Sequence, residues 1–187
     1  MKKFSLTLFM LLLWQSSLGA AEHKAVYDLT TGEPKKLEKF LLKGLKVLAE
    51  YYREEKSDYK MAVVISGDAY QFFVDNLKAS PYANDNALKT LQPKIAPRLR
   101  ELAEVYDINF TMCKTGMEAR EIPETSLYDY VEAEKMKNVY LIEFQNNGYA
   151  YMPIHQVTPY AAPSGRKSAT SSLSSRVHTP WLSEKGP

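Results

Sequence analysis

The sequence has very little cysteine: Cys113 is the only one among 187 residues. One thiol cannot form a disulfide within the chain, so an ordinary hydrophobic core must hold the fold together. Free cysteines are often small core residues, but a cysteine with thiolate character is a nucleophile. The residues alone leave both interpretations of Cys113 open.

Histidine is nearly as scarce, and His23, His155 and His178 all lie near the two ends of the chain. None of them has a cysteine or carboxylate at metal-ligand spacing, so we expect solvated histidines, no metal and no cofactor. The same scarcity argues against a Ser-His-Asp hydrolase or a metalloenzyme.

Excess charge of one sign is also missing, since the formal net charge is +2 and Lys2 and Lys3 lie at the very start of the chain. A protein that binds nucleic acid needs a clustered basic face to meet the phosphates. The sequence has no such cluster, so nucleic acid is not an expected partner.

Long hydrophobic runs are absent apart from Phe4–Trp14, which is shorter than the roughly 20 residues needed to span a bilayer. Two lysines precede this run, and a polar step followed by Gly19-Ala20-Ala21 comes after it, which is the layout of a secretory signal peptide cleaved after Ala21. A membrane anchor is the alternative interpretation. We expect residues 1–21 to be removed, leaving a periplasmic or secreted protein with no stable membrane insertion.

Composition divides the remaining chain into two parts. Residues 22–154 are long enough for one domain with its own core. Residues 155–187 have little apolar periodicity and are rich in Ser, Pro and Thr, which predicts a disordered tail.

Apolar patterning within residues 22–154 predicts alternating strands and helices. Strands are expected at 24–30 (KAVYDLT), 59–65 (YKMAVVI) and 107–112 (DINFTM). Between them, one broad apolar stripe predicts a helix of about five turns from Pro34, Asp68 can cap a helix at 69–77, and helical spacing returns at 95–106 after a polar, turn-rich stretch. This order favours an α/β sandwich with parallel strands.

The stretch NVYLIEFQNNGYAYMPI, 138–154, has two interpretations. Asn-Asn-Gly between two apolar segments is typical of a β-hairpin. Alternatively, 135–146 is a helix, Gly148 is its left-handed end residue, and YAYM is the last strand. Periodicity does not decide between them.

Cys113 directly follows a predicted strand, and sites in open parallel sheets form at the carboxyl ends of strands. If Thr115 caps a helix that starts near Gly116, backbone N–H groups and the Lys114 charge would favour a thiolate and could hold an anionic sulfur species. The candidate catalytic residue is therefore Cys113, with Lys114, Thr115 and Gly116 as candidate binding residues.

Ser66 and Gly67 follow the strand at 59–65 in the same way, just before Asp68. Because parallel strands end at one edge of a sheet, we add Ser66 and Gly67 to the candidate binding residues.

Four segments of the chain resemble the DsrE/DsrF-like family of small sulfur-metabolism proteins, over residues 24–154. They are KAVYDLTTGEPKKLEKFLLKGLKVL, MAVVISGDA, INFTMCKTGME and VYLIEFQNNGYAYMPI. The resemblance implies a three-layer sandwich with a mostly parallel five-stranded sheet, often assembled into trimers or hexamers, and it favours the helical interpretation of the last segment. In relay members a cysteine at the place of Cys113 carries sulfur as a persulfide.

The leading hypothesis is thus an exported sulfur carrier or sulfurtransferase that takes sulfane sulfur from a donor protein or polysulfide and passes it to an acceptor. The export signal distinguishes this chain from the cytoplasmic relay proteins it resembles. The alternative hypothesis is a non-catalytic binding or assembly module in which Cys113 is a buried structural residue.

Overall fold

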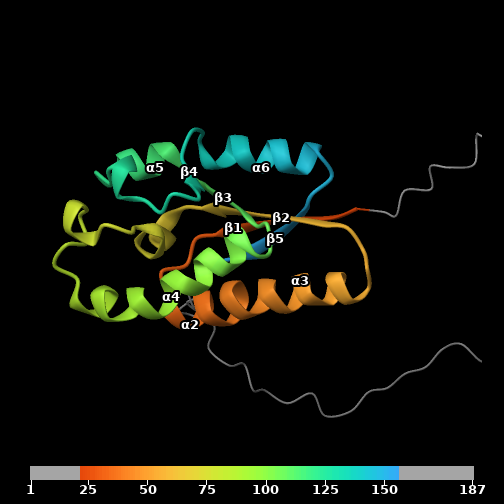
Figure 1. The fold of residues 1–187 in the computed structure, drawn as a ribbon. Coiled ribbons are helices and arrows are strands. Elements are labelled where there is room, and N and C mark those ends of the chain that lie inside the picture. Colours follow the sequence, from red (N-terminus) through yellow and green to blue (C-terminus); the bar gives the residue numbers. More distant parts are fainter. Residues whose placement is uncertain (1–21, 156–187) are drawn as a thin grey trace, which may run out of the picture. The chain divides into compact units, whose positions relative to one another are not determined.

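The computed structural model describes residues 22–155, which build a five-stranded sheet with helices on both faces (Figure 1). The strand order is β4-β3-β2-β1-β5, and every strand pair is parallel. The strands are His23–Leu29 (β1), Tyr59–Ile65 (β2), Asn109–Met112 (β3), Val131–Glu132 (β4) and Ala150–Ile154 (β5). The predicted α/β sandwich with a mostly parallel five-stranded sheet is confirmed.

Helices connect the strands, as parallel pairing requires. The α-helices are Pro34–Lys36 (α2), Gly44–Glu54 (α3), Asn86–Glu104 (α4), Lys114–Glu118 (α5) and Lys137–Asn146 (α6). A π-helical segment, Leu37–Lys43, joins α2 to α3, and short 3₁₀ segments lie at Gly67–Phe73, Leu77–Ala79 and Glu124–Ser126. None of the helices in residues 22–155 is both long and apolar enough to cross a membrane.

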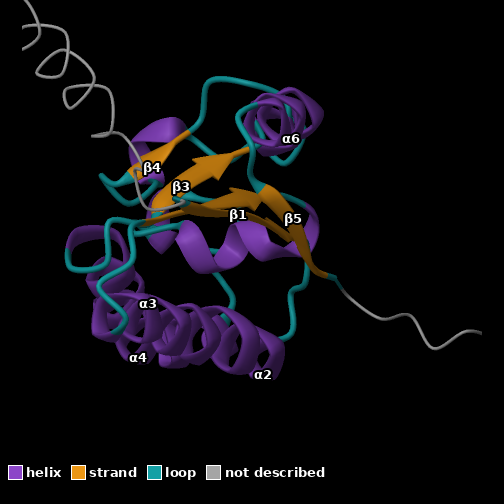
Figure 2. Cartoon of the chain, turned by 90° about the vertical axis from the view of Figure 1, so that its right-hand side faces the viewer, coloured by secondary structure: helices purple, strands orange, loops and turns teal. Residues whose placement is uncertain are grey.

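The sheet separates two layers of helices. Helices α2, α3 and α4 lie on one face, and α5 and α6 lie on the other (Figure 1); Figure 2 shows the same separation for α6. Strand β2 is central, and its residues Met61–Ile65 are all buried because helices cover both of its faces. Its apolar, β-branched run therefore correctly predicted a strand that is buried on both faces.

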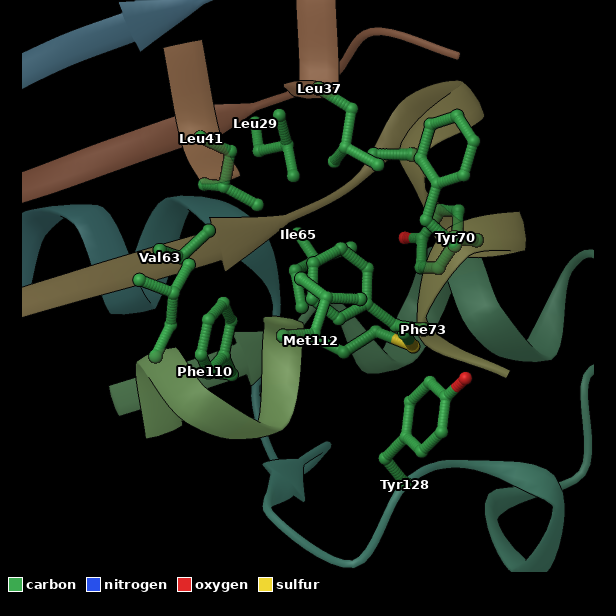
Figure 3. Packing of buried hydrophobic residues seen from close by; sticks show 14 of the residues in the cluster. Leu29, Leu37, Leu41, Val63, Ile65, Tyr70, Phe73, Phe110, Met112 and Tyr128 are labelled. Carbon is green, nitrogen blue, oxygen red and sulfur yellow. The ribbon is translucent and has the colours of Figure 1, made fainter. Parts of the chain in front are cut away.

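The larger core lies between the sheet and the α3–α4 layer (Figure 3). Phe73 and Phe110 pack there with ring centroids 5.5 Å apart. On the opposite face a smaller core, Val26, Ala62, Val64, Tyr140 and Leu141, lies beneath α6. Alternate residues of β1 and β2 supply the two cores, which is the period of a strand.

The helical region from Pro34 to Glu54 is confirmed, but its apolar stripe is only partly buried. Leu37, Leu41 and Leu45 have no exposed surface, whereas Val47 and Tyr51 remain 64% and 54% exposed. Only one side of this helix faces the sheet. The apolar residues at the margin of the predicted stripe therefore face away from the core.

Two other helix predictions need correction. Helix α4 begins at Asn86 rather than Ile95, because the Asp85 side chain accepts a hydrogen bond from Leu88 N–H at 2.9 Å and caps it early. The predicted helix at 69–77 is the 3₁₀ segment Gly67–Phe73 with Ser66 at its N-cap, so Asp68 does not cap a helix there.

The ambiguous C-terminal stretch forms α6 and β5, and the hairpin interpretation is wrong. Gly148 ends the helix with φ +84°, a conformation that costs glycine little. Strand β5 then pairs with β1, from Ala150 beside Ala25 to Ile154 beside Leu29. The predicted signal peptide, and all of the predicted tail 155–187 except His155, lie outside the described residues.

Candidate functional site

The residues that follow three neighbouring strands form a row along one edge of the sheet. Each donates its backbone N–H to the last carbonyl of the adjacent strand: Cys113 to Ile65 at 2.9 Å, Ser66 to Leu29 at 3.0 Å, and Thr30 to Ile154 at 3.1 Å. These bonds extend the ladder one residue past the strands. The structure therefore brings Cys113 and Ser66 side by side at the carboxyl edge, where sites of parallel sheets form.

Cys113 lies between β3 and α5 and serves as the N-cap residue of that helix. Its carbonyl accepts a hydrogen bond from Met117 N–H at 3.0 Å, which starts the helix, and another from the Tyr70 hydroxyl at 3.0 Å. The residue is 9% exposed and contacts the larger core. The thiol is thus held at the boundary between core and surface.

Helix α5 starts two residues earlier than predicted from the sequence. It begins at Lys114, so Thr115 lies inside the first turn and is not a cap. The Lys114 N–H donates to the Lys135 carbonyl at 3.0 Å. The N–H groups of Thr115 and Gly116 make no hydrogen bond within residues 22–155. Those two N–H groups lie in the first turn, directly after Cys113.

Gly116 permits a close approach between α5 and the 3₁₀ segment Gly67–Phe73. A Cβ atom on Gly116 would lie 2.1 Å from the Tyr70 hydroxyl oxygen and 3.0 Å from the ring carbon that carries it. No other residue fits there without moving the Tyr70 ring. Glycine at this position therefore allows Tyr70 to reach the Cys113 carbonyl.

Tyr70 is buried, and burial raises the pKa of its phenol above the ordinary value; the adjacent Cys113 side chain raises it further. The hydroxyl therefore stays protonated and remains a hydrogen-bond donor at neutral pH. The Arg120 guanidinium lies 5.0 Å from the centre of the Tyr70 ring, which is cation–π distance.

Ser66 and Gly67 form the adjacent turn. Ser66 is buried, and Gly67 has φ +61° with the Thr30 carbonyl oxygen 2.9 Å from where a Cβ would lie. The turn is closed by the Asp68 N–H, which donates to the Thr30 carbonyl at 3.1 Å. Gly67 is required here both by its backbone angle and by the close contact.

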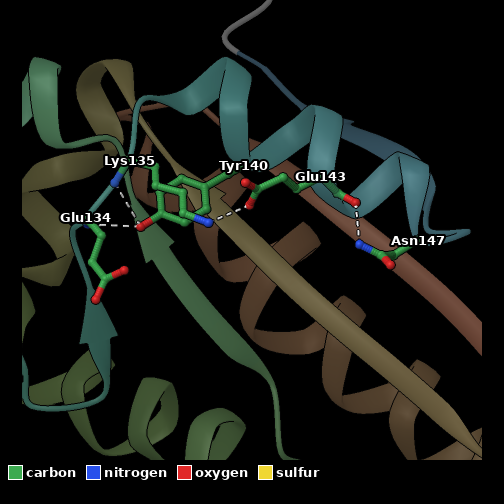
Figure 4. Close-up of polar contacts among 5 residues, drawn as sticks. All are labelled: Glu134, Lys135, Tyr140, Glu143 and Asn147. Atoms are coloured by element: carbon green, nitrogen blue, oxygen red, sulfur yellow. Dashed lines mark hydrogen bonds and ion pairs between the residues drawn. The ribbon is translucent and has the colours of Figure 1, made fainter.

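Hydrogen bonds and an ion pair hold the connection between β4 and α6 in place (Figure 4). The Tyr140 hydroxyl accepts hydrogen bonds from the N–H groups of Glu134 at 2.9 Å and Lys135 at 3.2 Å. The Lys135 side chain pairs with Glu143 at 2.7 Å. Because the Lys135 carbonyl binds Lys114 N–H, these contacts hold the residue next to Cys113.

A polar cluster that the sequence analysis missed lies farther along the same edge. The Asp28 side chain is 3% exposed, with one oxygen 2.8 Å from the Lys137 ammonium and the other accepting a hydrogen bond from the Tyr151 hydroxyl at 2.8 Å. The His155 ring is 3.1 Å from the Thr30 hydroxyl through Nδ1 and 3.3 Å from the Tyr151 hydroxyl through Nε2.

Burial and the bond to Asp28 raise the pKa of Tyr151 to about 12. The His155 side chain is 44% exposed, as expected for a solvated histidine, yet it contacts Thr30 and Tyr151. The sequence signal for this cluster was Asp28 itself, which lies within an apolar strand. A carboxylate that is buried in such a strand requires a partner. Among residues 22–155, no three His, Cys, Asp or Glu side chains are grouped to hold a metal ion.

Comparison with known proteins gives a family and a fold. The model of the DsrE/DsrF-like family matches residues 24–154. An uncharacterized protein of Aquifex aeolicus (strain VF5) is 28% identical over 153 residues, which are 82% of this chain and 64% of that protein. The chain therefore spans less than two thirds of the length of this relative.

Two solved structures are similar as well. The protein of unknown function MTH1491 from Methanobacterium thermoautotrophicum superimposes with a TM-score of 0.54 at 12% identity, over 70% of this chain and 98% of that one. The ychN protein from E. coli gives a TM-score of 0.43 at 16% identity, with the same coverage of both chains. The similarity to MTH1491 shows that the fold is shared.

Proposed function

Because the chain belongs to the DsrE/DsrF-like family, which is associated with sulfur metabolism, we propose that it carries sulfane sulfur as a persulfide on Cys113. The observation that carries this proposal is the position of Cys113. The only thiol of the sequence caps the first turn of a helix at the carboxyl edge of a parallel sheet. In such a position a cysteine can act as a nucleophile while its backbone is held by the fold.

The chemistry requires a thiolate and a means of holding an anionic sulfur. The N–H groups of Thr115 and Gly116 can donate to a sulfur anion on Cys113, and the Lys114 ammonium adds positive charge nearby. Ser66 and Gly67 form the adjacent wall at the end of β2. These residues are the binding set of the proposal.

Sulfur transfer needs no external oxidant. The Cys113 thiolate attacks the outer sulfur of a donor persulfide, R–S–SH, and forms a new sulfur–sulfur bond. The sulfur–sulfur bond of the donor breaks, and its electron pair leaves with R–S⁻. Attack of an acceptor thiolate on the outer sulfur of the Cys113 persulfide repeats the exchange and regenerates the Cys113 thiolate.

The setting of this reaction is part of the proposal. The leader at residues 1–21 supports export to the periplasm or beyond, and the family resemblance supports a trimer or hexamer that meets donor and acceptor proteins or polysulfide. Cell fractionation of the full chain tests export. Sedimentation analysis tests assembly, and a monomer at all concentrations would remove that part of the proposal.

Mass spectrometry of the intact protein after exposure to inorganic polysulfide tests the carrier function. The wild type should gain the mass of one or more sulfur atoms and lose it on reduction. Cys113→Ser is the matched control, since it keeps every other residue and should gain nothing. A wild-type mass that does not change would reject the carrier function.

A second candidate function is a non-catalytic binding or assembly module. It is favoured by the low exposure of Cys113, 9%, and by its contact with the core. In that case native thiol labelling should be slow and should accelerate sharply when the protein is unfolded. Fast labelling in the native state would support the carrier function instead.

A further inference from the structure

A cavity of about 450 Å³ opens at the same edge of the sheet as Cys113. Four separate segments line it, and its polar side chains include those of Glu33, Asp68, Gln71 and Arg120. The volume falls within the range of small-molecule sites, about 300–1,000 Å³. Cys113 is not among the lining residues.

The cavity contains one cation whose protein contacts are weak. Arg120 lies 3.9 Å from the Asp68 carboxylate and 3.4 Å from the Gly116 carbonyl oxygen, and its side chain is 41% exposed. Both distances exceed those of a good charge-assisted hydrogen bond, about 2.7–2.9 Å. The guanidinium can therefore form a closer ion pair with a ligand. A carboxylate matches its two-pronged donor geometry.

The cavity also contains a carboxylate with similarly weak contacts. Asp68 has Arg120 as its ion-pair partner at 3.9 Å, whereas Glu33 is already paired with Lys36 at 2.7 Å. The Gln71 amide donates to the carbonyls of Gly32 and Asp68. Arg120 and Asp68 thus offer one positive and one negative group at adjacent points, as the carboxylate and ammonium of an α-amino acid require.

Tyr70 lies between Arg120, which lines this cavity, and the backbone of Cys113. Arg120 lies over one face of the Tyr70 ring at 5.0 Å, and the Tyr70 hydroxyl donates to the Cys113 carbonyl at 3.0 Å. A ligand held at Arg120 must therefore extend past the Tyr70 side chain to bring a sulfur to Cys113. Cys113 is nearly buried, so the sulfur-bearing end must also be slender.

We propose that this cavity binds the amino-acid head of a small peptide thiol, with the ligand carboxylate on Arg120, the ligand ammonium on Asp68, and its sulfur directed past Tyr70 to Cys113. The head-group site does not depend on any reaction of the thiol. The transfer step rests on the proposed carrier function: the Cys113 thiolate takes the outer sulfur of the ligand persulfide, and the ligand leaves as its thiolate.

Binding is tested with S-methylglutathione, a tripeptide with a free α-amino-acid head and a blocked sulfur. In amide NMR titrations, resonances of Gly32, Asp68 and Gln71 should shift and saturate in the wild type and in Cys113→Ser. Arg120→Met should weaken binding at least tenfold, and so should N-acetylation of the probe, which removes the ammonium. Arg53→Met is the matched control, because Arg53 lies over the Tyr106 ring at 4.5 Å, outside the cavity.

Transfer is tested separately with glutathione persulfide and inorganic polysulfide. Arg120→Met should load Cys113 at least tenfold more slowly from low concentrations of glutathione persulfide, yet at the wild-type rate from polysulfide. Failure of both donors with the wild type would reject the carrier function but leave the binding result standing. No saturable shifts with S-methylglutathione, or equal binding by Arg120→Met or by the N-acetylated probe, would overturn the proposed head-group site.

Discussion

Tyr70 and Gly116 determine how the Cys113 backbone is held. The Tyr70 hydroxyl binds the Cys113 carbonyl, and this is possible because Gly116 has no side chain at the point where the ring oxygen lies. A core this close-packed responds to the addition of a single methyl group. The geometry at the thiol therefore depends on two residues from different segments.

Gly116→Ala should destabilise the fold by roughly 1–3 kcal/mol, because the new Cβ would lie 2.1 Å from the Tyr70 hydroxyl oxygen. Urea denaturation measures this. Adding Tyr70→Phe removes that oxygen and so relieves the close contact. The double variant should therefore lose less stability than the sum of the losses in the two single variants.

Gly44→Ala is the control for a glycine without such a contact. Its nearest neighbour would be the Lys39 carbonyl oxygen at 3.4 Å, and Gly44 starts the regular part of a helix. This change should stabilise the protein by up to about 1 kcal/mol. A neutral Gly116→Ala would contradict the close contact.

Asp28→Asn should destabilise the protein by roughly 1–3 kcal/mol, because the buried side chain loses its ion pair with Lys137 and the negative charge that strengthens its hydrogen bond from the Tyr151 hydroxyl. Chemical denaturation measures the free energy of unfolding. Asp129→Asn is the control, since that side chain is 73% exposed and its loss should change stability by about 0.5 kcal/mol or less. Equal effects of the two changes would argue against the buried cluster.

At the scale of the elements, the carboxyl edge is built by short segments rather than by long helices. Strand β4 has two residues and helix α5 has five. Such pieces are not stable alone, so hydrogen bonds between segments must hold them. The Tyr140 hydroxyl and the Lys135 carbonyl supply these bonds between β4, α5 and α6.

Tyr140→Phe should therefore loosen this connection. Loss of the two bonds to the N–H groups of Glu134 and Lys135 should cost roughly 0.5–1.5 kcal/mol. Hydrogen exchange should accelerate at the amides of Glu134, Lys135 and Lys114, and this is measurable by NMR.

Tyr149→Phe tests whether any tyrosine hydroxyl on this face has the same effect. The Tyr149 hydroxyl makes no hydrogen bond to the described part of the chain, and its ring packs against Phe144 at 4.9 Å. We expect unchanged exchange at Lys114 in this variant. Accelerated exchange in both variants would contradict a specific role for Tyr140.

At the scale of the whole molecule, tyrosine contributes much of the core and of its polar boundary. Burial raises the pKa of several phenols above the ordinary value, and these are Tyr27, Tyr70, Tyr82, Tyr106, Tyr128, Tyr130 and Tyr151. A raised pKa means that the folded protein keeps protons that the unfolded chain loses. This couples stability to alkaline pH.

The contribution of these phenols is fully present below a pH of about 10, where tyrosines of the unfolded chain also stay protonated. Above that pH the unfolded chain binds fewer protons, so the free energy of unfolding should fall as pH rises toward the folded pKa values. Urea denaturation at a series of pH values measures the slope.

Tyr151→Phe should make that slope shallower, because its folded pKa of about 12 no longer contributes. Tyrosinate absorbance should also lag behind that of free tyrosine until the fold opens. Complete ionisation near a pH of about 10 without loss of structure would contradict the raised pKa values of these phenols.

Much of the architecture follows from the sequence by itself. The run YKMAVVI predicts a doubly buried strand, and the alternation of strands and helices predicts a parallel α/β sandwich. These signals are local periodicities of apolar residues. Burial of apolar surface favours the strand or helix whose period matches the pattern. Cys113, Ser66 and Gly67 could be assigned to strand ends for the same reason.

Only the tertiary structure decided what meets at that edge. Arg120 and Asp68 are distant in the sequence and line one cavity, Tyr70 reaches the Cys113 carbonyl, and His155 contacts Thr30 at the end of the neighbouring strand. Such pairings depend on strand order, on the start of α5 and on a missing Cβ at Gly116, none of which has a periodic signal. The sequence by itself therefore determined the scaffold and the place of the thiol, and tertiary packing decided its surroundings.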